Sequence, residues 1–250
     1  MKCRWLEKDT FVSHEDFVKN FHVALPETFN FGFDVVDAIA AEEPDRRALV
    51  WCDDHGCERV FTMAEISRAS NRAANVFKAL GIRRGDAVML ILRRRYEYWF
   101  AVIGLCKLGA VAIPATNQLM KKDVAYRVKA ASVKMILSVN EPTIREAVDA
   151  AAAEVPVALR ALVNGGGDGT SWLDFNALMA GASDVLDDAD CARQTGSADV
   201  MLLYFTSGTT GMPKMVRHNF FYPFGHITTA KYWQCCQDGG LHLTLAETGW

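Results

Sequence analysis

Residues 61–92, FTMAEISRASNRAANVFKALGIRRGDAVMLIL, combine the pattern of an amphipathic helix with that of a buried strand. Thr62, followed three residues later by Glu65, forms a capping box, which marks the start of a helix. Apolar side chains then recur at helical spacing as far as Gly81, namely Ile66, Ala69, Ala73, Val76, Phe77 and Leu80. The nearly all-apolar run DAVMLIL at 86–92 is typical of a parallel strand covered on both faces. In succession, these patterns predict a parallel sheet covered by helices.

The same alternation continues along the rest of the chain. We expect apolar strands at 49–52, 111–114, 133–139, 158–163 and 200–205, a buried helix at 96–108, and a strand-like pattern at 241–246. Helical patterns separate most of the strands, so the predicted fold class is α/β, with a mostly parallel sheet flanked by helices. The small, acidic segment 181–197 is typical of a linker. We therefore predict an N-terminal α/β subdomain at 1–190 and the start of a second α/β subdomain at 191–250.

Composition and charge exclude several classes of protein. Apolar residues make up 50% of the 250 positions, enough for a sizeable core. The 27 basic and 30 acidic residues give a formal net charge of -3, so we expect no nucleic-acid partner. The longest apolar stretch, 98–106, is far shorter than the roughly 18 residues that suggest a membrane span. Because the N-terminus has early acidic residues and no signal-peptide pattern, we predict a cytoplasmic protein; the oligomeric state stays open.

Seven cysteines, an odd number without a C-x-x-C pair, indicate a reduced chain. Cys52, His55 and Cys57 in WCDDHGC could ligate a metal ion, but no second pair follows at zinc-finger spacing. We therefore predict an ordinary turn and no metal site. The adjacent Cys235 and Cys236 are expected to be buried thiols.

The stretch YFTSGTTGMPK at 204–214 places hydroxyl side chains, glycines and a lysine directly after the strand expected at 200–205. Glycine lets backbone N–H groups approach an anion closely, while Lys214 adds a positive charge, so this chemistry suits phosphate. The loop is not a Walker A motif, because Lys214 stands three residues after Gly211 and precedes Met215. It also lacks the glycines of a serine-hydrolase elbow. A plain hairpin loop leading to a short strand at 214–217 explains the same composition.

The segment YFTSGTTGMPKM resembles the phosphate-binding signature of the adenylate-forming superfamily, which includes acyl-CoA synthetases, adenylation domains and luciferases. Segments 61–88 and 93–128 also look like this family's early helix–strand and β-α-β units, so the chain resembles the N-terminal part of the family's large domain. TNQ at 116–118, ETGW at 247–250 and the methionine after Lys214 are most similar to the medium-chain acyl-CoA synthetase branch. Met215 and Glu247 depart from the wider pattern, where glycine and aspartate are commoner, and leave the choice of substrate open.

The resemblance implies a two-step reaction. A carboxylate attacks the α-phosphate of Mg-ATP to give acyl-AMP and pyrophosphate, and the thiol of CoA then displaces AMP. The implied ligands of the β- and γ-phosphates are Thr206, Ser207, Gly208, Thr209, Thr210, Gly211 and Lys214. The resemblance places the catalytic residues and a magnesium-binding glutamate beyond residue 250, so we expect this chain alone to be inactive. ATP, Mg²⁺, CoA and a carboxylic acid are the implied ligands of a longer parent enzyme. The alternatives are a ligase that loads a carrier protein and a non-catalytic nucleotide-binding module.

His218 and Trp250 are the candidate contacts to the acid, because the resemblance places part of the acid pocket after the loop. Several aromatic residues follow the loop, and an acid pocket lined by them would favour an apolar monocarboxylate. Ordinary packing in the core would explain the same residues equally well. They are Phe220, Phe221, Tyr222, Phe224, Tyr232 and Trp233. Arg93, Arg94 and Arg95 end a strand, where solvent or the phosphates of CoA are the expected partners.

Overall fold

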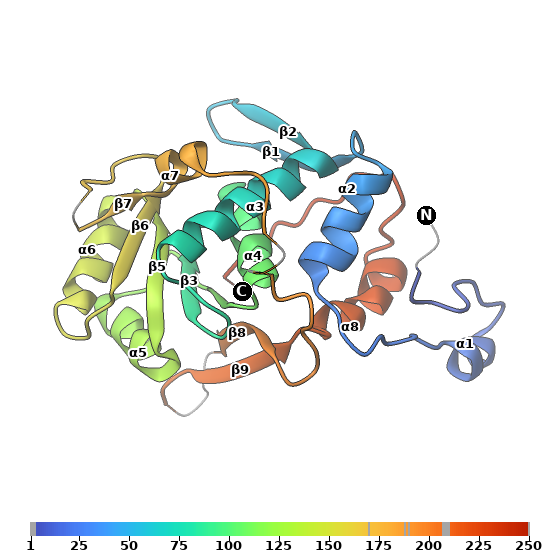
Figure 1. Cartoon of the computed structure of the whole chain (residues 1–250). Coiled ribbons are helices and arrows are strands. Elements are labelled where there is room, and N and C mark those ends of the chain that lie inside the picture. Colours follow the sequence, from blue (N-terminus) through green and yellow to red (C-terminus); the bar gives the residue numbers. More distant parts are fainter. Residues whose placement is uncertain (1–3, 170, 188, 190, 207–210, 250) are drawn as a thin grey trace.

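The structure, a computed structural model, describes residues 4–169, 171–187, 189, 191–206 and 211–249. Within these ranges the main sheet has seven strands in the order β7-β6-β5-β3-β4-β8-β9 (Figure 1). Its strands are β3 (Ala87–Ile91), β4 (Val111–Pro114), β5 (Val133–Val139), β6 (Leu159–Val163), β7 (Leu173–Asp174), β8 (Val200–Thr206) and β9 (Lys214–Asn219). All neighbouring pairs are parallel except β8 and β9.

Helices surround this sheet, and a small separate sheet lies beside it. The α-helices are α1 (His14–Asn20), α2 (Ala38–Glu42), α3 (Met63–Ala79), α4 (Glu97–Leu108), α5 (Lys121–Ala131), α6 (Pro142–Ala152), α7 (Phe175–Gly181) and α8 (Tyr222–Thr228). Two π-helical segments are η1 (Gly32–Asp37) and η3 (Thr229–Trp233). The separate sheet consists of β1 (Arg47–Cys52) and β2 (Glu58–Thr62).

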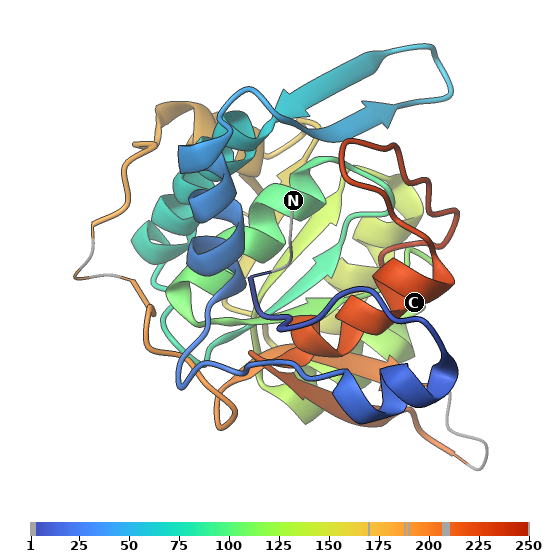
Figure 2. The same ribbon diagram turned by 90° about the vertical axis from the view of Figure 1, so that its right-hand side faces the viewer.

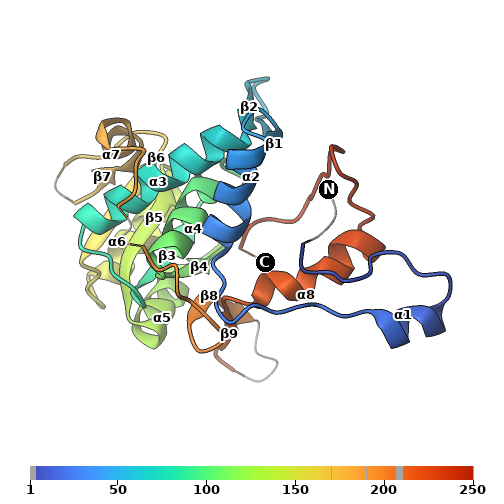
Figure 3. The same ribbon diagram turned by 45° about the vertical axis from the view of Figure 1, so that its right-hand side comes forward.

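The centre of the core is β3, in which every side chain is buried. The chain passes from β3 through α4 to β4 on one side, and then through α5 to β5 on the other side of β3. Right-handed crossovers in opposite directions place the connecting helices on opposite faces of the sheet. Accordingly, α3 and α4 cover one face and α5 and α6 the other (Figures 1 and 3). The predicted α/β class and mostly parallel sheet are confirmed.

The predicted start of the helix at Thr62 is confirmed in atomic detail. The backbone N–H of Glu65 donates to the Thr62 hydroxyl at 3.2 Å, and the backbone N–H of Thr62 donates to the Glu65 carboxylate at 2.8 Å. Both hydrogen bonds satisfy donors that the first turn of a helix leaves unpaired. Helix α3 then buries its apolar stripe, including Ile66, Val76 and Phe77.

Replacing Thr62 with alanine is expected to lower the free energy of unfolding by about 1 kcal/mol, because the N-cap hydroxyl is lost. Chemical denaturation followed by circular dichroism measures this change. Thr143→Ala is the matched control, since Thr143 is an exposed residue of α6 and its loss should change stability by less than about 0.5 kcal/mol. Equal stability of Thr62→Ala and wild type would contradict the role of the cap.

The strand expected at 49–52 exists as β1, but it does not join the main sheet. It pairs antiparallel with β2, a strand that the sequence analysis missed, and Figure 2 shows this hairpin projecting from the body of the molecule. The Asp53 carboxylate accepts from the backbone N–H groups of His55 and Cys57, both at 2.9 Å, and closes the turn. A short local turn favours pairing between adjacent strands over insertion into a distant sheet.

Two expectations about the C-terminal region are wrong. Cys235 and Cys236 are exposed thiols rather than buried ones. The alternating pattern at 241–246 forms no strand in the described part of the chain, and its three leucines, Leu241, Leu243 and Leu245, are 75–77% exposed. Alternation marks a strand only where a neighbouring strand supplies hydrogen bonds, and no described strand lies along this segment.

The linker expected at 181–197 runs from the end of α7 to β8 and is anchored on the core. The hydroxyl of Thr195 donates to the carbonyl of Phe29 at 2.7 Å. The buried Asn30 amide donates to the carbonyls of Cys106 and Ala192 at 2.8 and 3.0 Å. After the linker, β8 continues the main sheet beside β4. The division into subdomains at 190/191 stays a prediction.

Candidate functional site

The carboxyl ends of β3, β4 and β8 bring together the segments that the sequence analysis singled out. The hydroxyl of Thr248, in ETGW, donates to the carbonyl of Arg93 after β3 at 2.7 Å. The backbone N–H of Asn117, in TNQ after β4, donates to the Glu247 carboxylate at 3.3 Å. The loop at 207–213 follows the neighbouring strand, β8. Ligands of open α/β sheets bind at this edge, so the shared location supports a ligand site.

Gly249 allows the ETGW segment to approach the end of β4 closely. A Cβ atom on Gly249 would lie 2.3 Å from the backbone nitrogen of Thr116 and 2.4 Å from the carbonyl carbon of Ala115. Backbone atoms cannot move away cheaply, so only glycine fits this contact. Trp250, the predicted acid contact, lies outside the described residues.

The predicted phosphate loop connects β8 and β9 as a hairpin. Thr206 pairs with Lys214 at the end of the antiparallel ladder, and both residues are exposed. The Thr206 hydroxyl lies 3.5 Å from the Lys214 carbonyl. Lys214 forms no ion pair with any of the described residues, and its side chain is exposed. Gly211 is exposed as well, whereas the predicted ligands Ser207, Gly208, Thr209 and Thr210 lie outside the described residues.

Helix α5 contacts both flanks of this hairpin loop, a feature that the sequence analysis missed. The Tyr126 hydroxyl donates to the carbonyl of Pro213 at 2.9 Å, and its ring meets that of Phe205 edge-on at a centroid distance of 6.1 Å. The Arg127 guanidinium lies 5.1 Å from the centre of the Phe205 ring. Burial lowers the pKa of Arg127. No local pattern reveals these contacts, because Tyr126 and Pro213 are 87 positions apart.

His218, the other predicted acid contact, lies on β9 within an aromatic cluster. Its ring is 4.2 Å from that of Tyr222 and 5.8 Å from that of Tyr204, measured between centroids. Burial and then the charge of His226 lower the pKa of His218. His218 is four residues beyond Lys214, or about 13 Å along a strand, so it lies away from the phosphate loop. Its contact with an acid stays a prediction.

The aromatic residues after the loop divide into packing residues and exposed ones. Phe220 and Phe224 are buried, and Phe224 packs on Phe29 at a centroid distance of 4.5 Å. Tyr232 contacts Phe17 of α1 at 5.6 Å, whereas Trp233 is 85% exposed. Packing therefore explains Phe220 and Phe224, and the described residues do not gather into one acid pocket.

The arginines after β3 have protein partners. Arg93 pairs with Glu141 at 2.6 Å, and Arg95 pairs with the buried Glu97 at 2.9 Å. Arg94 donates to the carbonyl of Leu245 at 2.6 Å. These contacts favour a structural role at the strand end over binding to the phosphates of CoA.

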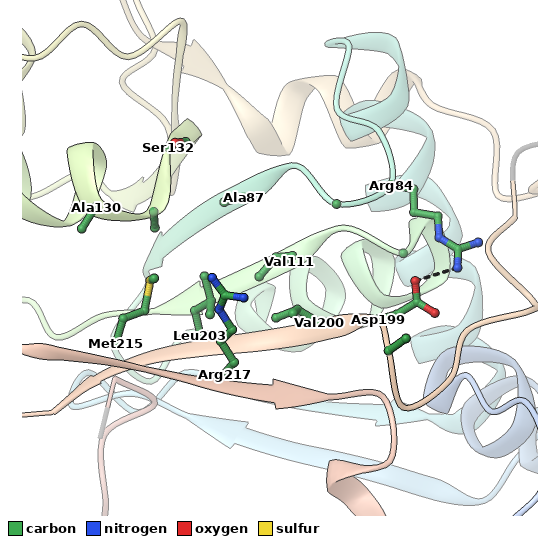
Figure 4. A pocket seen from close by; sticks show the side chains of 14 residues that line it. Arg84, Ala87, Val111, Ala130, Ser132, Asp199, Val200, Leu203, Met215 and Arg217 are labelled. Carbon is green, nitrogen blue, oxygen red and sulfur yellow. Dashed lines mark hydrogen bonds and ion pairs between the residues drawn. The ribbon is translucent and has the colours of Figure 1, made fainter.

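A cavity of about 380 Å³ lies at the opposite edge of the sheet (Figure 4). Ala87, Val111 and Val200, the first residues of β3, β4 and β8, line it. Arg84 and Asp199 form an ion pair of 2.7 Å at one end, and Arg217 lies near Leu203. Because these are the amino ends of the strands, the cavity is separate from the predicted phosphate site.

Among the described residues, no three histidine, cysteine, aspartate or glutamate side chains gather as a metal site. Cys52, His55 and Cys57 instead occupy the β1–β2 hairpin and its turn. The described helices also include none that is long and apolar enough to cross a bilayer.

Comparison with known proteins matches residues 36–243 to a family model described as AMP-binding enzyme. The chain is 36% identical over 233 residues to acyl-coenzyme A synthetase ACSM4, mitochondrial, from Rattus norvegicus. It is 35% identical over 233 residues to acyl-coenzyme A synthetase ACSM5, mitochondrial, from Homo sapiens. Each alignment covers 90% of this chain and 39% of the relative, so the chain spans about two fifths of their length.

Solved structures show the same fold. A Brucella canis acyl-CoA synthetase has a TM-score of 0.77 at 22% identity, over 89% of this chain and 39% of the other. The anthranilate CoA ligase AuaEII in complex with anthranoyl-AMP has a TM-score of 0.69 at 25% identity, over 84% of this chain and 38% of the other. The resemblance inferred from YFTSGTTGMPKM is thereby confirmed at the level of the family.

The same comparisons contradict the cytoplasmic location that was predicted from the sequence, and this prediction is wrong. Both curated relatives are named as mitochondrial proteins. The composition of a folded domain does not identify its compartment, because targeting segments are read separately from the fold. The lack of a secretory pattern in the N-terminal sequence therefore could not distinguish the cytoplasm from an organelle.

Proposed function

The chain belongs to the AMP-binding enzyme family, and on that basis we propose that it provides the phosphate-binding part of an ATP-dependent acyl-CoA synthetase. The main support is the juxtaposition at the carboxyl edge of the sheet, where β8, which leads into the loop, ends beside β4, and where the ETGW segment contacts the ends of β3 and β4. The loop presents Lys214 as an exposed cation without an ion-pair partner among the described residues. This arrangement suits an anion that approaches from solvent.

In the proposed reaction, a carboxylate oxygen of the acid attacks the α-phosphorus of ATP. The bond from that phosphorus to the oxygen bridging to the β-phosphate breaks, and pyrophosphate leaves with the electron pair. The deprotonated sulfur of CoA then attacks the acyl carbon, and AMP leaves. Negative charge grows on pyrophosphate in the first step, so donors around its phosphates stabilise the transition state.

We assign the β- and γ-phosphates to the loop. Lys214 supplies a full positive charge, and the hydroxyl of Thr206 and the backbone of Gly211 supply hydrogen-bond donors at its two flanks. Ser207, Gly208, Thr209 and Thr210 are assigned to the same phosphates by the family motif.

Mg²⁺ enters this scheme as part of the substrate Mg-ATP. Mg²⁺ keeps several waters and binds through phosphates and one or two carboxylates, so it needs no cage built by this chain. CoA is the second substrate, and its site is not assigned to residues of this chain.

The acid substrate is proposed to be an apolar monocarboxylate of short to medium size, aliphatic or aromatic. His218 and Trp250 are the proposed contacts, and the ring of Tyr222 beside His218 offers apolar surface. Such surroundings bury methylene or ring carbons better than they pair with the ammonium group of an amino acid.

An activity assay tests this function on the protein encoded by the whole reading frame that contains these residues. Thioester formation with CoA would be measured for acids from acetate to decanoate, for benzoate and for several amino acids. We expect ATP-dependent thioester formation with a graded preference across chain length, because one methylene changes specificity by about 1–3 kcal/mol. Acyl-AMP formation without a CoA thioester, or turnover confined to amino acids, would favour a carrier-loading ligase. ATP binding without any turnover would favour a nucleotide-binding module.

A further inference from the structure

Helix α5 contacts the polypeptide on each side of the loop between β8 and β9. On the exit side, the Tyr126 hydroxyl donates to the Pro213 carbonyl at 2.9 Å, one residue before Lys214. On the entry side, the rings of Tyr126 and Phe205 are in contact, one residue before Thr206. The Arg127 guanidinium lies over the same Phe205 ring. One short stretch of helix therefore contacts both points at which the chain enters and leaves the loop.

Among the described residues, the hairpin offers few other restraints at this position. The β8–β9 ladder ends at the pair Thr206–Lys214, and the hydrogen bond from the Thr206 hydroxyl to the Lys214 carbonyl is long, at 3.5 Å. Pro213 has no N–H group and therefore cannot extend the ladder as a donor. Its carbonyl is therefore the one backbone group of Pro213 that can form a hydrogen bond, and it lies just before Lys214. Tyr126 is the residue that binds it.

Helix α5 is a firm support for this contact. The carboxylate of Asp123 accepts from the backbone N–H of Met120 at 3.1 Å and so caps the start of the helix. Val124 and Val128 are buried against the sheet. A side chain on a capped helix with a buried face loses little freedom when it forms a hydrogen bond, so the geometry at Pro213 is set in advance.

We propose that Tyr126 is a positioning residue, which holds the exit of the loop so that Lys214 meets the phosphates in a fixed orientation. This inference rests on the proposed function, because it assigns a role to Tyr126 through Lys214. Tyr126 does not itself bind the nucleotide. Its hydroxyl restricts the backbone before Lys214, and this lowers the entropy lost when phosphate binds.

The test compares Tyr126→Phe with wild type in the 250-residue chain. The substitution removes only the hydroxyl and keeps the ring contact with Phe205. Tyr232→Phe is the matched control, because Tyr232 also donates to a backbone carbonyl, that of Asp9 at 3.2 Å, far from the loop in the sequence. Amide hydrogen exchange of residues 211–216, except Pro213, and calorimetric binding of inorganic pyrophosphate would be measured for all three proteins.

We expect Tyr126→Phe to exchange the amides at 211–216 faster and to bind pyrophosphate about threefold to tenfold more weakly, the range for one lost neutral hydrogen bond. Tyr232→Phe should match wild type in both measurements. Unchanged exchange and unchanged binding in Tyr126→Phe would overturn the inference, as would an equal loss in the control.

The proposed function and the inference fail in different ways. If wild type does not bind pyrophosphate, the assignment of the loop fails, and hydrogen exchange alone still decides whether Tyr126 restrains residues 211–216. If wild type binds pyrophosphate and Tyr126→Phe binds it equally well with equal exchange, the loop assignment holds and the role of Tyr126 is overturned.

Discussion

Replacing Lys214 with alanine is expected to weaken the binding of inorganic pyrophosphate by at least about tenfold. A charge-assisted hydrogen bond to phosphate contributes about 1.5–3 kcal/mol, and about 1.4 kcal/mol corresponds to a tenfold change in affinity. Lys214 is exposed and has no ion-pair partner among the described residues, so its removal should not disturb the fold. Wild-type binding is itself expected to be weak, in the range of about 1 mM or roughly -4 kcal/mol.

Calorimetric titration at low ionic strength measures this effect, because salt screens exposed charges. Lys129→Ala is the matched control. Lys129 is also an exposed lysine, but it lies in the last turn of α5, whereas the loop lies at the carboxyl edge of the sheet. Tight binding that does not change in Lys214→Ala would show that pyrophosphate binds elsewhere. An equal loss in Lys129→Ala would indicate only a general effect of net charge.

Replacing Gly104 with alanine is expected to lower the free energy of unfolding by about 1–3 kcal/mol, the typical cost of overpacking a core. Gly104 lies where α4 crosses α3. A Cβ atom there would lie 2.9 Å from both the backbone nitrogen of Ala74 and the carbonyl oxygen of Ser70. It would also lie 3.0 Å from the Cβ of Ala73, so the two helices would have to separate.

Gly225→Ala provides the control for this prediction. Gly225 lies inside α8. In the described part of the chain, no atom of a neighbouring element lies within 4 Å of the position that a Cβ atom on Gly225 would take. The same substitution should therefore raise stability at this position by up to about 1 kcal/mol, since alanine is the better helix former. Urea denaturation of both variants measures the two changes. Stabilisation of similar size at both positions would contradict the close packing of α3 on α4.

Local patterns in the sequence were sufficient for the main elements of the fold. The capping box at Thr62 predicted α3, because it depends only on hydrogen bonds within one turn. The all-apolar run at 86–92 predicted β3, because every side chain of that strand is buried. The composition of the loop indicated a connection that leads to a short strand beginning at Lys214, and β9 begins there. The family motif, rather than composition, separated a phosphate-binding loop from a plain hairpin, and the hairpin geometry agrees with both.

The features that the sequence analysis missed depend on contacts between distant residues. The hydrogen bond from Tyr126 to Pro213 joins a helix to a loop, and nothing in the sequence near Tyr126 distinguishes it from a solvent-facing residue. The placement of β1 outside the main sheet follows from its pairing with β2, which competes with tertiary pairing. Cys235 and Cys236 were expected to be buried because free cysteine is among the most often buried residue types, but both side chains are exposed.

The central claim is that the loop between β8 and β9 binds the phosphates of ATP. Nuclear magnetic resonance of the ¹⁵N-labelled 250-residue chain, titrated with inorganic pyrophosphate and separately with Mg-ATP, tests it most directly. The largest amide shifts are predicted for Thr206, Gly211 and Lys214 and for the residues between them, with little change at Arg84 and Arg217 in the cavity at the opposite edge. Shifts confined to Arg84 and Arg217, or no saturable shifts anywhere, would contradict the claim.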